Sequence, residues 1–259
     1  MSKPAGRCVF CGKVGVTKGH VWPDWLNSIL PRTSTHHDQT TGVFTTFTPE
    51  VPGPPRTEIT RQGHARSRKP RNTCAGCNSG WMSRIEDEAI AVTSALIKDQ
   101  EIRFDENEQR RLAALLCLIT MRLEFLSHMR AIPLEDRLHL KQYGEPPKLW
   151  TIWITKYLGE KADDHWSRFC AMQVGSTPPD KVGAVHCNTQ VTTMVIGKLC
   201  AHLFSSTVSP IIGYEGIRLA RIWPLTGLGI DSRFIPGIDD KAVVWLHEAL
   251  ARESKPVPR

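Results

Sequence analysis

The chain has 259 residues, 41% of them hydrophobic, and its 33 Lys and Arg against 26 Asp and Glu give a formal net charge of +7. This composition is ordinary for a globular protein, so its core needs no disulfide staples. The longest apolar stretches, such as residues 112–120, are too short to span a bilayer, and no apolar run of the signal-peptide type follows Met1, so we expect a cytoplasmic protein with no membrane partner.

The first 73 residues are predicted to form short strands and turns. Residues 1–19 have the pattern of a hairpin, with glycines at its turns. Pro23 can open a short helix through Leu30, because proline suits the first turn of a helix. In residues 33–73, threonine and aromatic side chains lie between turn residues at 42–48 and 57–60, which predicts strands there.

The pattern then changes to that of a helix. Apolar residues recur every three or four positions over residues 81–96, and Asn78 or Ser79 can serve as the N-cap. One face of this helix is apolar, so we expect that face to pack on another helix or on a sheet rather than to contact a cofactor.

A second helix is predicted to begin at Asp105, whose carboxylate can form a capping box with Glu108, and to continue until Pro133. Beyond residue 148, strand-like pieces alternate with clusters of Gly, Pro and Asp. The predicted strands are 149–154, 168–174, 190–197 and 216–223, and a closing helix is predicted at 242–253. The fold class is therefore predicted to be α+β.

Four of the eight cysteines form two C-x-x-C pairs, Cys8 with Cys11 and Cys74 with Cys77. Thiolates two residues apart can bind one Zn²⁺ from a tight turn, and two such turns close a tetrahedral structural site. Zinc ribbons usually separate their pairs by about 15–20 residues, whereas here roughly 60 intervene, so the second pair must return to the first. Unrelated free thiols or two disulfides are the alternatives; a reducing cytoplasm favours the metal.

The remaining cysteines have no pair spacing and lie in apolar segments, where a thiol packs as a small hydrophobic side chain. A second metal site, formed by His186 and Cys187 with Cys200 and His202, is the alternative. The four cysteines concerned are Cys117, Cys170, Cys187 and Cys200.

A basic run precedes the second cysteine pair, with Glu58 the only acid in it. Such a run is often a solvated face, but beside a metal knuckle it is well placed to neutralise phosphates, the sequence-independent part of nucleic-acid affinity. We therefore predict nucleic-acid contacts from Arg61, Arg66, Arg68, Lys69 and Arg71, with Arg56 at the start of the run.

The order of motifs is C-x-x-C, then Thr17-Lys-Gly-His-Val-Trp-Pro, then Cys74-Ala-Gly-Cys-Asn-Ser-Gly-Trp-Met-Ser. This order resembles the zinc-stapled HNH endonucleases, also called His-Me fingers, of bacterial or phage type. The resemblance covers about residues 5–100 and implies a ββα-metal module with a structural zinc. We accordingly divide the chain into an HNH-like module at 1–100 and an α+β region at 101–259 to which the resemblance assigns no role.

Carried over by position, the resemblance makes His20 the general base, since an imidazole titrates near working pH. It makes Asn78 a ligand of a catalytic Mg²⁺ or Mn²⁺, a role for hard oxygen donors, while a plain N-cap is the equally supported alternative. Asn72 is the candidate for the residue that orients the His20 ring.

Gly19 departs from the family pattern, which commonly places an acidic metal ligand immediately before the histidine. Either Asn78 holds the cation together with Glu86 or Asp24 and more waters, or the chain binds nucleic acid without cutting it, or it is a substituted form of an active parent. For Glu86, a solvated first-turn carboxylate favourable to the helix dipole is the alternative. We expect a DNA endonuclease; RNA as the substrate and a homo-oligomeric state are left open.

Overall fold

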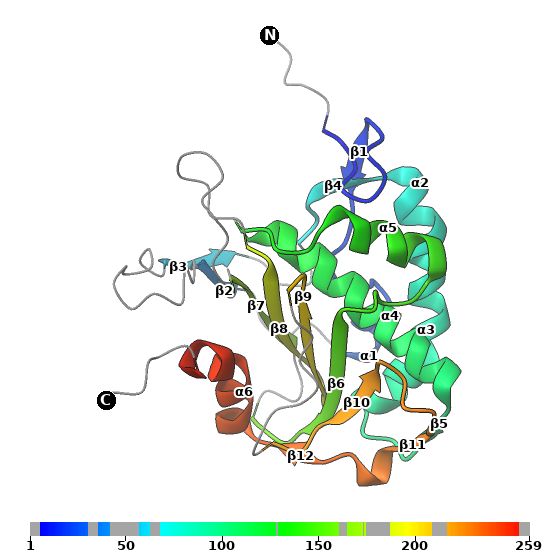
Figure 1. Cartoon of the computed structure of the whole chain (residues 1–259), viewed down its shortest axis with the longest axis vertical. Helices are drawn as coiled ribbons and strands as arrows, with labels where there is room; N and C mark the ends of the chain where they lie inside the picture. Colours follow the sequence, from blue (N-terminus) through cyan, green and yellow to red (C-terminus); the bar gives the residue numbers. More distant parts are fainter. Residues whose placement is uncertain are drawn as a thin grey trace.

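The computed structural model describes residues 6–30, 36–41, 57–62, 68–127, 129–160, 165–172, 174, 187–208 and 217–253. Figure 1 shows a group of helices lying against one face of a curled sheet, with a small two-stranded ribbon beyond the helices and a last helix near the other end of the sheet. The chain is a mixed α+β fold, as its sequence predicts.

The N-terminal part is built on two short strands far apart in sequence, β1 (Val16–Lys18) and β4 (Arg71–Cys74). They pair antiparallel, with Val16 opposite Cys74 and Thr17 opposite Thr73. Between them lie α1 (Leu26–Ile29) and a second antiparallel pair, β2 (His36–Thr41) and β3 (Thr57–Gln62). The strand predicted at 57–60 is thus confirmed inside β3, whereas the one predicted at 42–48 lies outside the described residues.

Helical structure follows β4 without a break. It runs through α2 (Ala75–Cys77), a wide π-type turn η2 (Asn78–Met82) and α3 (Ser83–Ile97). The N-cap interpretation of Asn78 and Ser79 is wrong, because Cys74 precedes the first helical turn and Asn78 itself has helical backbone angles. A kink at Gly80, where φ is −103° and ψ −110°, separates this first turn from α3.

The next helix, α4 (Glu106–Leu123), confirms the predicted capping box, since the Asp105 and Glu108 side chains each accept from the other residue's backbone N–H. It ends in the short turn η3 (Glu124–Leu126). A further helix, α5 (Leu134–Tyr143), directly follows Pro133. The predicted continuation of the preceding helix to Pro133 is wrong, because α4 ends at Leu123, η3 ends at Leu126 and Ser127 is already extended. The helix that begins after Pro133 was not predicted.

The sheet has the strand order β10-β6-β9-β8-β7, and each neighbouring pair in this order is antiparallel. Strand β12 pairs in parallel with the last residues of β6, Lys156 and Tyr157. Its strands are β6 (Trp150–Tyr157), β7 (His165–Met172), β8 (Thr189–Ile196), β9 (Leu199–Ser206), β10 (Ala220–Trp223) and β12 (Gly237–Ile238). The remaining elements are β5 (Arg103–Phe104), β11 (Ile230–Asp231), η4 (Ser232–Phe234) and α6 (Asp240–Glu253). All four predicted strands and the closing helix have counterparts here. Strand β9 and the two-residue strands β5, β11 and β12 were not predicted.

One hydrophobic core connects the N-terminal part to the sheet. It runs from Phe10 near the first cysteine pair, through Leu112 and its neighbours on α4, to Ile152 and Leu203 on the sheet. A smaller cluster packs α6 on the other side of the sheet, through Val243 and Leu246. The division at residue 100 stays a prediction, and the continuous core holds the hairpin firmly against the rest of the fold.

Candidate functional site: a four-cysteine cluster beside the β1–β4 hairpin

The two C-x-x-C pairs meet in space. The sulfurs of Cys8, Cys11, Cys74 and Cys77 all lie within 4.8 Å of one another, and the sulfurs of Cys11 and Cys74 are 3.6 Å apart. A tetrahedral zinc with Zn–S bonds of about 2.3 Å sets its sulfurs about 3.8 Å apart. The cluster therefore has the donor set and the spacing to hold one metal ion such as Zn²⁺, and none of the four forms a disulfide.

Backbone hydrogen bonds shape the first pair into a tight turn. The Gly12 N–H donates to the Cys8 carbonyl over 2.8 Å, and the Cys8 N–H donates to the Lys13 carbonyl over 2.9 Å. Gly12 has φ of +71°, which glycine adopts without steric cost. This local geometry turns the sulfurs of Cys8 and Cys11 toward the same point.

The β1–β4 ladder brings the second pair to the first. Cys74 ends β4 opposite Val16, and the Val9 N–H donates to the Asn72 carbonyl over 2.9 Å. Cys77 then closes the single turn of α2. The long insertion between the two cysteine pairs is accommodated because β1 and β4, which lie on either side of it, pair with each other.

Burial and hydrogen bonding act on the thiols in opposite directions. Burial raises the pKa of the Cys8 thiol, but hydrogen bonds from the backbone N–H groups of Cys74, Phe10 and Cys11 outweigh it and lower that pKa to about 7. Burial raises the pKa of Cys77 to about 12. A cation bound among the four sulfurs would have to displace the proton of Cys77 at neutral pH.

Gly19 and Asn78 lie in contact at the end of the hairpin. A Cβ on residue 19 would be 3.1 Å from the Asn78 Oδ1 and 3.9 Å from the Thr73 Cβ. Residue 19 follows β1, and Asn78 follows α2, so the pairing of β1 with β4 brings these two segments together. The structure thus brings together two positions that the sequence analysis compared from the motif alone.

His20 is half-buried, with a quarter of its side chain exposed, and its Nε2 lies 3.8 Å from the Asp24 Oδ1. Asp24 is largely exposed and also accepts a hydrogen bond of 2.8 Å from the Asn27 side chain. An exposed carboxylate therefore lies beside the imidazole that the sequence analysis proposed as general base.

Asn72 lies on β4 at an irregularity of the ladder, where Thr73 pairs with Thr17 and Arg71 with Lys18. Its Oδ1 accepts from the Thr73 hydroxyl over 3.0 Å. Its buried Nδ2 has no hydrogen-bond acceptor within the described part of the chain. Buried donors are nearly always satisfied, so the folded structure does not account for this amide group by itself. The predicted role of Asn72 in orienting the His20 ring stays a prediction.

Glu86 forms an ion pair with a residue that the sequence analysis did not consider. The Arg122 Nη1 on α4 lies 2.5 Å from the Glu86 Oε1, and Arg122 is 3% exposed. The other Arg122 nitrogen, Nη2, lies 3.4 Å from the Met82 Sδ. The pair ties α3 to α4, and the predicted role of Glu86 as a cation ligand stays a prediction.

The structure describes part of the basic run. Lys69 and Arg71 are exposed and Arg68 is half-buried. Arg56 and Arg66 lie outside the described residues, and for Arg61 in β3 only the backbone is described. Lys18, which the sequence analysis passed over, is exposed on β1 directly opposite Arg71.

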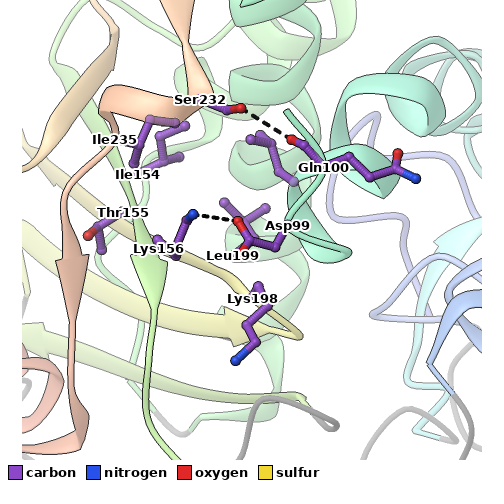
Figure 2. Close-up of a pocket in the computed structure, with 10 residues that line it drawn as sticks. Asp99, Gln100, Ile154, Thr155, Lys156, Lys198, Leu199, Ser232 and Ile235 are labelled. Atoms are coloured by element: carbon purple, nitrogen blue, oxygen red, sulfur yellow. Dashed lines mark hydrogen bonds and ion pairs between the residues drawn. The ribbon is translucent and has the colours of Figure 1, made fainter. Parts of the chain in front are cut away.

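A small cavity lies at the other end of α3 (Figure 2). Its volume is about 20 Å³, room for roughly one water molecule. Asp99 and Gln100 line it from just beyond α3, where Lys156 pairs with Asp99 over 2.6 Å and Ser232 donates to the Gln100 carbonyl. The fifteen residues of α3 span about 22 Å, so this cavity is separate from the hairpin.

The remaining cysteines confirm the packing interpretation at three positions, since Cys117, Cys170 and Cys200 are buried. Cys187 is half-buried. Within the described part of the chain, the four-cysteine cluster is the only group of three or more side chains placed to hold a metal ion, and no helix there is long and apolar enough to cross a bilayer. Comparison with protein-family models, curated proteins and solved structures found no match for this chain.

Proposed function

We propose that this chain is a metal-dependent endonuclease that hydrolyses phosphodiester bonds in DNA, with His20 as the general base. The observation that carries the proposal is the contact of Gly19 with the Asn78 side chain beside a four-cysteine cluster. It sets the residue before the candidate base against Asn78, which directly follows α2 and which the resemblance to HNH endonucleases makes a ligand of the catalytic cation.

The chemistry required of the protein is the removal of one proton from water. His20 takes that proton as the water oxygen bonds to phosphorus, the bond from phosphorus to the 3′ oxygen breaks, the leaving oxygen takes a proton from solvent, and His20 then releases its proton to solvent. Asp24, 3.8 Å from the imidazole, would favour the imidazolium formed in that step.

A bound Mg²⁺ or Mn²⁺ would supply positive charge to the phosphate and leaving oxygens. The Asn78 Oδ1 is a suitable hard donor for such an ion, but it approaches the Gly19 side of the chain rather than the side that carries the His20 imidazole. Of the two carboxylates considered, Asp24 is exposed and near His20, whereas Glu86 already neutralises Arg122. We therefore assign the carboxylate role to Asp24 in preference to Glu86.

The second candidate function is a nucleic-acid-binding module that does not cut. Gly19 favours it, because a glycine offers no ligand where the family pattern commonly has an acid. In that case the four-cysteine cluster and the hairpin serve binding alone.

Plasmid cleavage with added Mg²⁺ or Mn²⁺ tests the proposal. We expect His20→Ala to abolish cleavage while DNA binding survives, and His139→Ala, a substitution of a half-buried histidine on α5, to leave both unchanged. Equal cleavage by wild type and His20→Ala would remove His20 from the mechanism, and binding without cleavage by wild type would favour the second candidate.

A further inference from the structure

The pairing of the hairpin continues beyond its two named strands. Lys18 lies opposite Arg71, and the Gly19 N–H then donates to the Pro70 carbonyl over 3.2 Å. The Val21 N–H donates to the Arg68 carbonyl over 3.4 Å. These bonds keep one antiparallel register from residue 18 to residue 21.

This register sets His20 opposite Lys69. Successive side chains of an extended chain point to opposite faces, and directly opposed residues share a face. His20 therefore shares one face of the ribbon with Lys18, Lys69 and Arg71. Gly19 belongs to the other face, which agrees with the approach of its Cβ position to Thr73 and Asn78.

The three cationic side chains on this face make no ion pair within the described part of the chain that would stabilise the fold. Lys18, Lys69 and Arg71 are exposed, and among the residues that the structure describes none of the three forms an ion pair. Like charges directly opposite each other, as in Lys18 with Arg71, destabilise a two-stranded ribbon. An anionic ligand bound between them would remove this repulsion.

We propose that Lys18, Lys69 and Arg71 form a phosphate-binding row that holds a nucleic-acid backbone across the face of the ribbon bearing His20. The ligand is a run of phosphodiester groups, which arginine and lysine contact as charged hydrogen-bond donors. The row adds Lys18 to the residues expected to contact nucleic acid. It rests on the nucleic-acid partner of the proposed function but not on cleavage.

Electrostatic contacts of this kind have a measurable signature. Each phosphate neutralised on duplex DNA contributes about −0.9 to the slope of log K against log salt concentration, and about −0.7 on a single strand. Replacing all three side chains by alanine should make the slope for duplex DNA shallower by about 3, and Lys18→Ala alone should make it shallower by about 1.

The experiment measures binding of fluorescent duplex DNA, and of RNA of the same length, by anisotropy from 50 to 300 mM salt without added Mg²⁺ or Mn²⁺. The test variant carries Lys18→Ala, Lys69→Ala and Arg71→Ala. The matched control removes three exposed lysines elsewhere, at Lys98, Lys141 and Lys148, so that the net charge changes equally. Bound metal and the circular dichroism spectrum verify that each variant is folded.

A shallower slope in the row variant, with the control variant like wild type, supports the row, and the nucleic acid that shows the effect identifies the source of the phosphates. Equal slopes in the row and control variants would overturn it, even if plasmid cleavage by wild type persisted. Absence of salt-dependent binding by wild type to both nucleic acids would overturn it as well. Binding that depends on the row in a protein that never cleaves DNA would leave the row standing and reject the endonuclease.

Discussion

The side-chain oxygen of Asn78 lies so close to Gly19 that a Cβ on residue 19 would be only 3.1 Å from it. The residue that departs from the family pattern therefore also makes room for Asn78. Any side chain introduced at residue 19 would therefore displace the Asn78 side chain, in addition to any ligand that it adds to the site.

Gly19→Ala tests this relationship with the smallest possible side chain. The new methyl group should displace the Asn78 side chain by a few tenths of an ångström, at a cost of about 1 kcal/mol in the free energy of unfolding. If the Asn78 oxygen binds the cation, the Mn²⁺ concentration needed for half-maximal cleavage should rise at least severalfold. Gly76→Ala is the matched control, because a Cβ there meets nothing within 4 Å; the same Mn²⁺ dependence in both variants would contradict a role for this contact.

Gly19→Glu asks whether the chain lacks only an acidic ligand. We expect the longer side chain to displace the Asn78 oxygen, so that a carboxylate replaces an amide rather than joining it. Cleavage rates of Gly19→Glu and of Gly19→Glu combined with Asn78→Ala should then agree within about twofold. A much slower double variant would show that both side chains act together at the site.

Cys74→Ser should release the bound metal and destabilise the N-terminal part of the chain. A structural zinc contributes its binding energy to folding, and Cys74 is also the residue at which β4 meets α2. Metal analysis should give about one zinc per chain for wild type and little for the variant. Cys187→Ser, at a half-buried cysteine outside the cluster, should retain the metal; folded wild-type protein free of zinc would sink the assignment.

Acid should release the same metal. The pKa of Cys77 is raised to about 12 by burial, so at neutral pH binding must displace its proton, and the apparent affinity falls as pH falls. Titration with a chromogenic chelator between pH 8 and 5 should show progressively easier release. A retention that does not vary with pH would argue against thiolate ligation.

The ion pair of Glu86 with Arg122 should contribute to stability in a way that a cation ligand would not. Removing one partner of a buried pair costs about 3–5 kcal/mol, because the other charge stays buried. We expect Glu86→Gln to lower the free energy of unfolding by about 3 kcal/mol in urea titrations without divalent cations. Glu88→Gln, at an exposed position of the same helix, should change it by less than about 0.5 kcal/mol.

If Glu86 were instead a ligand of the cation, Glu86→Gln would leave the free energy of unfolding without metal unchanged. It would also raise the Mn²⁺ concentration needed for half-maximal cleavage. Combining Glu86→Gln with Arg122→Met should destabilise by less than the sum of the two single changes, since the double variant leaves no unpaired charge. Additive losses would mean that the two side chains do not interact.

The sequence by itself determined the features that depend on neighbouring residues. Two C-x-x-C turns, the capping box of Asp105 with Glu108 and the apolar periodicity of α3 are local patterns, and the structure contains all of them. Helix α4 shows no such periodicity of burial, because every residue from Leu112 to Leu123 is buried. Strand β9 was not predicted because it contains no Val, Ile or Thr, whereas β8, which is equally buried on both faces, is rich in them. Helix α5 was not predicted because Pro133 was interpreted as the end of the preceding helix, whereas α4 already ends at Leu123 and Pro133 is the N-cap of α5.

Only the tertiary structure decided what surrounds the candidate site. That Asn78 contacts Gly19, that Glu86 is paired with Arg122 from another helix, and that Lys18 faces Arg71 all depend on residues more than 30 positions apart. Side-chain periodicity says which face a residue lies on but not what packs against that face. Long-range strand pairing and helix packing supply that information. Here the pairing of β1 with β4 places the exposed side chains of Lys18 and Arg71 opposite each other.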